Sequence, residues 1–328
     1  MSSKPFRFSL QCFNTDSPQN WRNLINKTED LGYSTFFLAD HFLSPGPALD
    51  PTFHPPQMLA AVPAIAMALE QTDTLRVGCR VFCNDYRHPV ILAKEAATMD
   101  YLSGGRLEFG IGAGWIRSEY EAAGISFDHF PARFARMTES VAAYKAFMSG
   151  EPLELDGESV SWSGFSGTPA PAQRPYPPLM IGGGSRKILE FAGAEADIVS
   201  LNFNNRAGML GPDGMNSGLA EATARKIDWI KQGAGNRFRD IELEIGAYNT
   251  IITDHQEATA AAIGEALGMS TADILEHPHC LIGSVDYICE ELLRRREVYG
   301  ISYIAVLDDG ENNMVEAFAP VVQRLAGK

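Results

Sequence analysis

Apolar and polar residues alternate along this chain in two kinds of segment. Short runs such as 35–40 (TFFLAD) are almost continuously apolar, which is typical of a strand buried on both faces of a parallel sheet. Between them lie longer segments with the helical spacing of apolar residues. The segment 89–105, for example, begins at a proline and ends in glycines, as helices often do. The pattern therefore predicts repeated strand–helix units.

Eight strands, each followed by helical sequence, account for most of the chain. We expect the strands at residues 6–12, 35–40, 75–82, 106–114, 179–184, 197–203, 241–253 and 302–308. We expect helices at residues 18–33, 55–72, 89–105, 133–150, 185–196, 219–234 and 313–327, with two or three more between 256 and 299. Within the α/β class, this strict alternation favours a closed (β/α)₈ TIM barrel over an open doubly wound sheet, with residues 1–328 as one domain.

Two segments interrupt the alternation. Residues 150–178 are rich in glycine, proline and serine and contain one short alternating run, which predicts an irregular insertion with a small hairpin. Residues 202–216 form a long glycine-rich loop after the sixth strand. Because this loop follows a strand, we expect it at the catalytic end of the barrel. The insertion follows a helix and is expected at the opposite end unless it folds back.

Charge and composition narrow the choice of partners. The net charge is −14 and no run of five Lys or Arg residues occurs, which argues against a nucleic-acid partner. No apolar run approaches the roughly 20 residues of a membrane helix, and no N-terminal signal segment is evident. The five scattered cysteines are expected to be reduced and mostly buried. Reduced thiols indicate a cytoplasmic location. Neither the cysteines nor His277 and His279 have the spacing of a metal site, so we expect no metal. We also expect a small-molecule substrate.

In a barrel, the active site is assembled from the loops that follow the strands. Asp40 and His41 follow the second strand, and His41 is a candidate general acid or hydrogen-bond donor. A purely structural role for His41 is the alternative. Asn84 follows the third strand and Asn202 follows the sixth. His88 precedes a proline and is expected to cap or brace the next helix.

Residues 181–187 (IGGGSRK) carry the clearest chemical signal. Three glycines lead from a strand into a helix whose first turn holds Ser185, Arg186 and Lys187. Backbone N–H groups at a helix N-terminus attract an anion, and two nearby cations would reinforce that attraction. We interpret the segment as a phosphate site. The alternative is a simple turn in which Ser185 caps the helix, and the spacing of a P-loop is absent.

A second run of glycines follows the fourth strand, at Gly112, Ala113 and Gly114. Glycines weaken a strand, so at its end they indicate either a tight turn or the close approach of a bulky group. Their spacing does not match the dinucleotide-binding fingerprint. A phosphate pocket beside a floor of glycines suggests a flavin-like cofactor whose flat ring lies on the backbone.

Several motifs resemble the luciferase-like monooxygenase superfamily, and within it the oxidoreductases that use coenzyme F420, a deazaflavin. The segments that carry the resemblance are "ADHF", "YRHPVILAKEAATMDYLSGGRLEFGIGAGW", "SEYEAAGISF", "RFARMTES", "IGGGSRKILEFAGAEADIV", "GSVDYICEELLRRREVYGISYIAV" and "EAFAPVVQRLAG". They extend over nearly the whole chain.

The resemblance implies a bacterial-luciferase-like barrel with the cofactor ring in its mouth and a homodimer that meets through helices on one side. It implies a cis peptide bond between Arg80 and Val81, and Asp40 and His41 are the expected catalytic residues. The residues expected around the cofactor are His41, Arg80, Val81, Asn84, Gly112, Ala113, Gly114, Gly182, Gly183, Gly184, Ser185 and Arg186. Trp115 and Asn202 are expected in the substrate pocket.

Three functions remain open from the sequence. The favoured one is hydride transfer between the deazaflavin and a small organic substrate. The second is an FMN-dependent monooxygenase on the same barrel, and the third is a barrel without catalytic activity. Trp115 stands where the sugar-phosphate dehydrogenases of the family carry a glutamate directly after the strand-four glycines. The absence of this glutamate counts against sugar-phosphate dehydrogenase activity.

Overall fold

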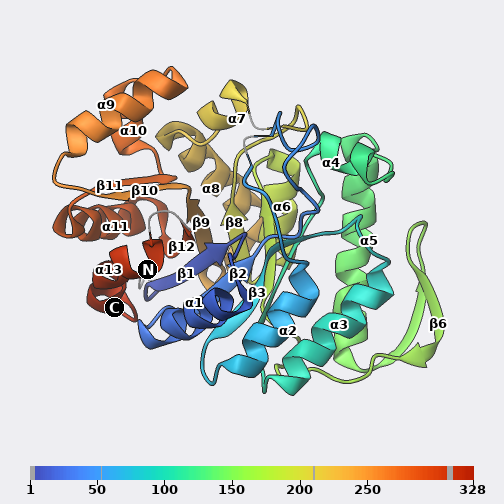
Figure 1. The fold of residues 1–328 in the computed structure, drawn as a ribbon. Helices are drawn as coiled ribbons and strands as arrows, with labels where there is room; N and C mark the ends of the chain where they lie inside the picture. Colours follow the sequence, from blue (N-terminus) through green and yellow to red (C-terminus); the bar gives the residue numbers. More distant parts are fainter. Residues whose placement is uncertain (1–3, 53, 210, 309–312) are drawn as a thin grey trace.

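The computed structural model describes residues 4–52, 54–209, 211–308 and 313–328. Its centre is a closed barrel of eight parallel strands (Figure 1). In order around the barrel these are β1 (Arg7–Cys12), β12 (Ile301–Asp308), β9 (Glu242–Ala247), β8 (Ile198–Leu201), β7 (Leu179–Gly183), β4 (Leu107–Gly112), β3 (Arg76–Cys83) and β2 (Thr35–Leu38). The predicted TIM barrel is therefore confirmed.

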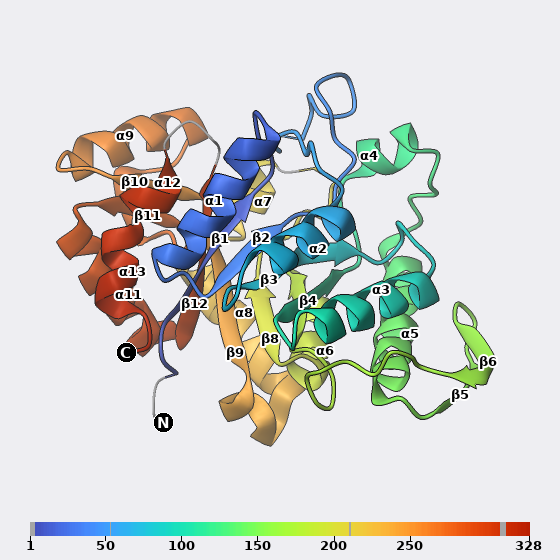
Figure 2. The same cartoon turned by 60° about the horizontal axis from the view of Figure 1, so that its bottom comes forward.

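Helices surround the strands on the outside, as both views show (Figures 1 and 2). Those that connect successive strands are α1 (Pro18–Asp30), α2 (Ala61–Gln71), α3 (Pro89–Leu102), α5 (Phe130–Ser149), α6 (Arg186–Glu195), α8 (Ala220–Ala234) and α11 (Val285–Tyr299), and α13 (Ala319–Leu325) closes the chain. The additional elements are α4 (Arg117–Ala122), α7 (Pro212–Asn216), η1 (Gly235–Asp240), α9 (Gln256–Leu267), α10 (Thr271–Glu276) and α12 (Met314–Ala317).

The predicted strand at 241–253 is wrong in one respect, because it consists of two strands. Its first half is β9 of the barrel, whereas β10 (Asn249–Ile252) lies outside and pairs in parallel with β11 (Cys280–Gly283). The sequence pattern did not reveal β11, which is a short apolar run between two helices. The predicted last helix is also divided, because Pro320 cannot donate the backbone hydrogen bond that would continue it.

The predicted hairpin in the first interruption is confirmed. It consists of β5 (Pro152–Asp156) and β6 (Ser161–Ser166), which pair antiparallel and stand beside α5 and α3 (Figure 1). The second interruption contains α7 and reaches the loop after β4, since the Arg117 N–H donates to the Gly208 carbonyl at 3.0 Å. The second loop therefore lies at the carboxyl ends of the strands, as predicted.

Charged side chains on the barrel strands form two ion-paired groups, the first partly exposed and the second buried. In the first, Arg7 bonds to Glu108 and to Glu242, the latter at 2.7 Å. In the second, Arg80 Nε donates to Glu244 Oε1 at 2.8 Å, and both side chains are at most 3% exposed. A buried carboxylate without a partner would be strongly destabilising, so each arginine fixes the position of its acidic partner.

Val81 explains the glycines on the two strands beside it. The β3–β4 register shifts between Cys79 and Phe82, so that Arg80 and Val81 form a bulge, and the predicted cis peptide bond joins these two residues. A Cβ on Gly112 would lie 2.7 Å from Val81 Cγ2, and one on Gly182 would lie 3.2 Å from Val81 Cγ1. These glycines therefore leave room for a protein side chain.

Gly114 has a different reason to be glycine. Its φ is +72°, in the left-handed region, and a Cβ there would lie 1.8 Å from the Tyr120 hydroxyl oxygen. The glycines after β4 thus combine close packing around Val81 with a tight turn before Trp115. Neither feature requires a ligand, although the turn shapes the surface on which one would lie.

Gly112→Ala should destabilise the fold, because the new Cβ would overlap the Val81 side chain. Overpacking of this kind typically costs about 1–3 kcal/mol in the free energy of unfolding, which urea denaturation measures. Gly211→Ala is the matched control, since no described atom lies within 4 Å of its Cβ position. Adding Val81→Ala to Gly112→Ala should recover part of the loss. A Gly112→Ala variant as stable as the parent would contradict this packing.

Candidate active site

The carboxyl ends of β2 and β4 bring His41 and Trp115 together, as predicted from their positions after these strands. The two ring centroids are 6.2 Å apart. A third ring, that of His54, lies 4.3 Å from His41 and 6.1 Å from Trp115. The ring centroid of Phe13, which follows β1, lies 5.1 Å from that of His54. His54 therefore lies among rings supplied by three strand ends.

His41 is paired with a carboxylate that the sequence analysis did not identify. Its Nδ1 lies 2.8 Å from Oε2 of Glu119, a residue of α4. The Tyr86 hydroxyl donates to the same oxygen at 2.5 Å, and the Phe42 N–H donates to Oε1. Burial raises the pKa of Glu119, but the hydrogen bonds from His41, Tyr86 and Phe42 outweigh it and hold the pKa below its ordinary value.

His54 differs from His41 in its hydrogen-bond partner. Its Nδ1 lies 2.7 Å from the Pro55 carbonyl oxygen. Because a carbonyl only accepts, Nδ1 carries the proton and Nε2 presents a lone pair. Burial, reinforced by the nearby His41, lowers the pKa of His54 to about 3. His54 is therefore a neutral hydrogen-bond acceptor beside a histidine that faces a carboxylate.

Asp40, predicted to be catalytic, has both carboxylate oxygens engaged. Arg87 donates to Oδ2 at 2.7 Å and to Oδ1 at 2.9 Å, and the Cys83 N–H also donates to Oδ2. Asp40 is only 3% exposed. These contacts favour a role in holding the end of β3 beside β2 over a role in proton transfer.

The predicted cofactor residues on β3 are held by contacts within the protein. The Arg80 side chain points into the barrel toward Glu244, and its guanidinium also donates to the Tyr248 hydroxyl. The same hydroxyl donates to Asn202 Oδ1 at 2.5 Å, which links Arg80 to the loop after β8. The Asn84 N–H donates to the Gly112 carbonyl at 3.0 Å, so that Asn84 joins the ends of β3 and β4.

Ser185 begins α6, but its side chain does not cap the helix. The structure shows no capping hydrogen bond from Ser185, and its Oγ is buried without a hydrogen-bond partner among the described residues. A buried hydroxyl normally has a partner. The capping alternative is therefore wrong, and an oxygen-bearing ligand at this helix N-terminus would satisfy both Ser185 and the free backbone N–H groups.

The two cations expected to reinforce this site face other partners. Arg186 bonds to Glu190 at 2.7 Å on the exposed surface of α6, and Lys187 Nζ lies 4.6 Å from the centre of the Phe134 ring. A Cβ on Gly183 would lie 2.3 Å from Ile188 Cγ2. The glycines before α6 thus allow close packing within the protein, and the predicted support from Arg186 and Lys187 is not observed.

The structure adds three residues to the site: Glu119, Tyr86 and His54. Glu119 lies in the segment SEYEAAGISF, which carried part of the family resemblance without a role for this residue. His54 lies in a proline-rich loop and gave no periodic signal. His88 accepts a hydrogen bond from the Val90 N–H at the start of α3, so its predicted capping role is confirmed.

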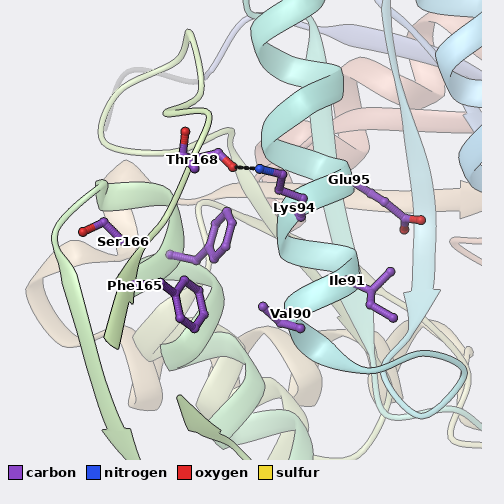
Figure 3. A pocket seen from close by; sticks show the side chains of 8 residues that line it. Val90, Ile91, Lys94, Glu95, Phe165, Ser166 and Thr168 are labelled. Atoms are coloured by element: carbon purple, nitrogen blue, oxygen red, sulfur yellow. Dashed lines mark hydrogen bonds between the residues drawn. The ribbon is translucent and has the colours of Figure 1, made fainter. Parts of the chain in front are cut away.

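A groove of about 360 Å³ lies on the outside of the barrel, away from these residues (Figure 3). It separates α3 from the β5–β6 hairpin, and Lys94 donates to the Thr168 carbonyl across it. It is lined by Val90, Ile91, Lys94, Glu95, Phe147, Phe165, Ser166 and Thr168. None of these residues belongs to a loop that follows a barrel strand, so the groove is separate from the candidate active site.

Within the described ranges, no three His, Cys, Asp or Glu side chains are grouped as they would be around a metal ion. All five cysteines are buried and unpaired by disulfides. Among the helices of the described residues, none has the length and apolar character needed to span a membrane.

Glu119→Gln should destabilise the protein at neutral pH. The folded pKa of Glu119 is lowered from 4.5, so its carboxylate stabilises the fold above that pH and the contribution is lost as pH falls through the folded value. We expect a loss of about 1–3 kcal/mol in unfolding free energy at pH 7, shrinking below pH 4.5. Urea denaturation across this range measures it. Glu121→Gln, whose side chain is 62% exposed on the same helix, is the control. A difference that did not change with pH would contradict this account.

The chain is similar in sequence to enzymes of two kinds. It is 24% identical to the FMNH(2)-dependent dimethylsulfone monooxygenase of Pseudomonas putida over 199 residues, which are 61% of this chain and 50% of that protein. It is 29% identical to the F420-dependent glucose-6-phosphate dehydrogenase of Amycolatopsis mediterranei over 172 residues, 52% of this chain and 49% of that protein. The matched segments therefore span about half the length of these relatives.

Solved structures share the whole fold at lower identity. The coenzyme F420 dependent tetrahydromethanopterin reductase from Methanopyrus kandleri aligns over 99% of both chains, with a TM-score of 0.75 and 18% identity. A long-chain alkane monooxygenase aligns over 98% of this chain and 92% of its own, with a TM-score of 0.72 and 16% identity. The model of the luciferase-like monooxygenase family matches residues 5–295. The chain therefore belongs to the luciferase-like monooxygenase family.

Proposed function

We propose that this protein is an oxidoreductase that transfers a hydride between coenzyme F420 and a small organic substrate. The observation that carries the proposal is the His41–Glu119 pair at the mouth of the barrel, with 2.8 Å between Nδ1 and Oε2. Hydride addition to a polarised double bond leaves negative charge on the substrate, which a positioned proton donor can neutralise. A histidine supported by a carboxylate is suited to that role.

The residues at the barrel mouth fit a flavin-like cofactor with a phosphate. The buried Ser185 Oγ lacks a partner in the described part of the chain, and it lies where the first N–H groups of α6 are free to bind an anion. When bound, the deazaflavin supplies or accepts the hydride. Ser185 would hold its phosphate, and Trp115 and His54 would form one wall of the substrate pocket.

Each of the two histidines would then have a distinct task. His41 places Nδ1 against Glu119, so its Nε2 is available to hold or deliver a proton, and no described residue bonds to that atom. His54 stays neutral and presents a lone pair. Together they would orient a substrate that accepts a hydrogen bond at one point and donates one at another. The cytoplasmic location and the homodimer remain part of this proposal.

A second candidate is an FMN-dependent monooxygenase on the same barrel. The similarity to the dimethylsulfone monooxygenase of Pseudomonas putida favours it. Its chemistry would need reduced flavin and oxygen, and the same Ser185 site would hold the FMN phosphate. The two candidates therefore differ in the ring that binds above the strand ends.

Cofactor binding should distinguish them. We expect coenzyme F420 to bind more tightly than FMN when the purified protein is titrated and cofactor fluorescence is followed. The deazaflavin should also be reduced or oxidised in single turnover without oxygen consumption. FMN binding as tight as F420 binding, or oxygen uptake with reduced FMN and substrate, would favour the monooxygenase.

His41→Ala should slow hydride transfer about 10²–10⁴-fold, the usual contribution of a general acid, with little change in cofactor affinity. Stopped-flow oxidation of the reduced deazaflavin, with an acceptor found by screening ketones, imines and enones, measures this rate. His129→Ala, which alters an exposed histidine, is the control. Normal turnover by folded, cofactor-loaded His41→Ala protein would leave His41 with a structural role only.

A further inference from the structure

Lys226 of α8 is a buried lysine that the proposed chemistry does not use. It is 2% exposed, and its Nζ donates to the Asn202 carbonyl oxygen at 2.6 Å. Among the described residues no carboxylate forms an ion pair with it. Burying an ammonium group without a counter-ion is costly in free energy. A buried lysine without an anionic partner among the described residues therefore suggests that a ligand supplies the anion.

The position of Lys226 places its ammonium group at the mouth end of the barrel. Side chains on a helix point back toward the helix N-terminus, and the N-terminus of α8 follows the loop after β8. Asn202, which accepts the hydrogen bond, lies directly beyond the end of β8. The same carbonyl oxygen would be 2.4 Å from a Cβ on Gly184. The Asn202 carbonyl therefore lies against both the Lys226 ammonium group and the backbone of Gly184, which precedes Ser185 and α6.

This location has positive potential, and no carboxylate of the described residues pairs with Lys226. The N-terminus of α6 carries partial positive charge and free N–H groups, and the buried Ser185 Oγ has no partner among the described residues. Within the described part of the chain, Lys226 has one acceptor for its three N–H donors. Burial lowers the pKa of Lys226 to about 7, which fits an amine that lacks a counter-ion.

We propose that Lys226 binds the phosphate of the cofactor, together with Ser185 and the N–H groups at the start of α6. The ligand class is a phosphate mono- or diester. The inference rests on the proposed function only in requiring a phosphate-bearing cofactor, and it holds for either a deazaflavin or FMN. In this proposal Lys226 is the cation at the phosphate site, in place of Arg186 and Lys187, whose side chains face Glu190 and the Phe134 ring.

Two histidines that lie near Lys226 are neutral. His277 and His279 come from the segment between α10 and β11, and both are 1% exposed. Burial lowers the pKa of His277 to about 4 and holds that of His279 well below its ordinary value. Their rings bond to the Met215 and Gly246 carbonyl oxygens. Arg80, which lies near His279, is paired with Glu244. Near His277 lie Asp273 and Arg295, and Arg295 is paired with Glu291. Lys226 can therefore gain a proton when an anion binds.

Two matched ligand pairs test the proposal, because the members of each differ in the phosphate. They are FMN with riboflavin, and coenzyme F420 with the phosphate-free 8-hydroxy-5-deazariboflavin. Lys226→Met keeps most of the side-chain volume and removes the charge. We expect it to weaken binding of the phosphate-bearing member at least tenfold and to leave the phosphate-free member unchanged. Lys226→Arg should retain part of the affinity, and Lys187→Met should change neither.

Calorimetry on the unaltered protein provides a test that does not depend on a variant. At pH 8 the free amine is mostly neutral, so phosphate binding should take up close to one proton, whereas riboflavin should take up none. Titrations in buffers with different ionisation enthalpies measure this number. Equal uptake for FMN and riboflavin would overturn the proposal, as would equal weakening of both ligands by Lys226→Met. Preference for FMN over F420 would instead refute only the cofactor assignment.

Discussion

The contact of Val81 with the glycines of β4 and β7 determines the shape of the barrel mouth. Because Gly112 and Gly182 have no side chains, the bulge at the end of β3 can fill the space above these strands. The same bulge turns Arg80 into the barrel, where it pairs with Glu244 and reaches Tyr248. Tyr248 in turn holds the Asn202 side chain. One packing constraint thus connects the ends of β3, β4, β7 and β8.

The fold was predictable because each barrel strand is a short apolar run between helical segments, which few architectures share. The pattern failed where that rule was broken. The segment 241–253 is continuously strand-like, but after Ala247 the chain leaves the barrel and β10 pairs with β11 instead of with a barrel strand. Periodicity records which residues are buried, and it does not record which neighbouring strand buries them.

The candidate site was predictable only in part, for a related reason. His41 and Trp115 could be found because they directly follow strands that end at the same side of the barrel. Glu119 could not, since its bond to His41 joins residues 78 positions apart. Arg186 and Lys187 are adjacent to the predicted anion site in sequence, but on the helix their side chains face Glu190 and Phe134. Their position in the sequence therefore suggested a contribution to anion binding that their contacts do not support. Lys226, the cation we propose instead, belongs to a different helix, α8.

The strand order separates His41 from Ser185 by β3 and β4. His41 and Glu119 follow β2 and β4, whereas Ser185 follows β7 and Lys226 of α8 bonds to Asn202 after β8. Around the barrel, β3, β4 and β7 are consecutive, and Val81 lies against the last two of them. Val81 thus lies at the strand ends between His41 and Ser185. An apolar side chain between a proton donor and an anion site would suit a flat ring with a phosphate tail, and it would exclude water from the face of the ring.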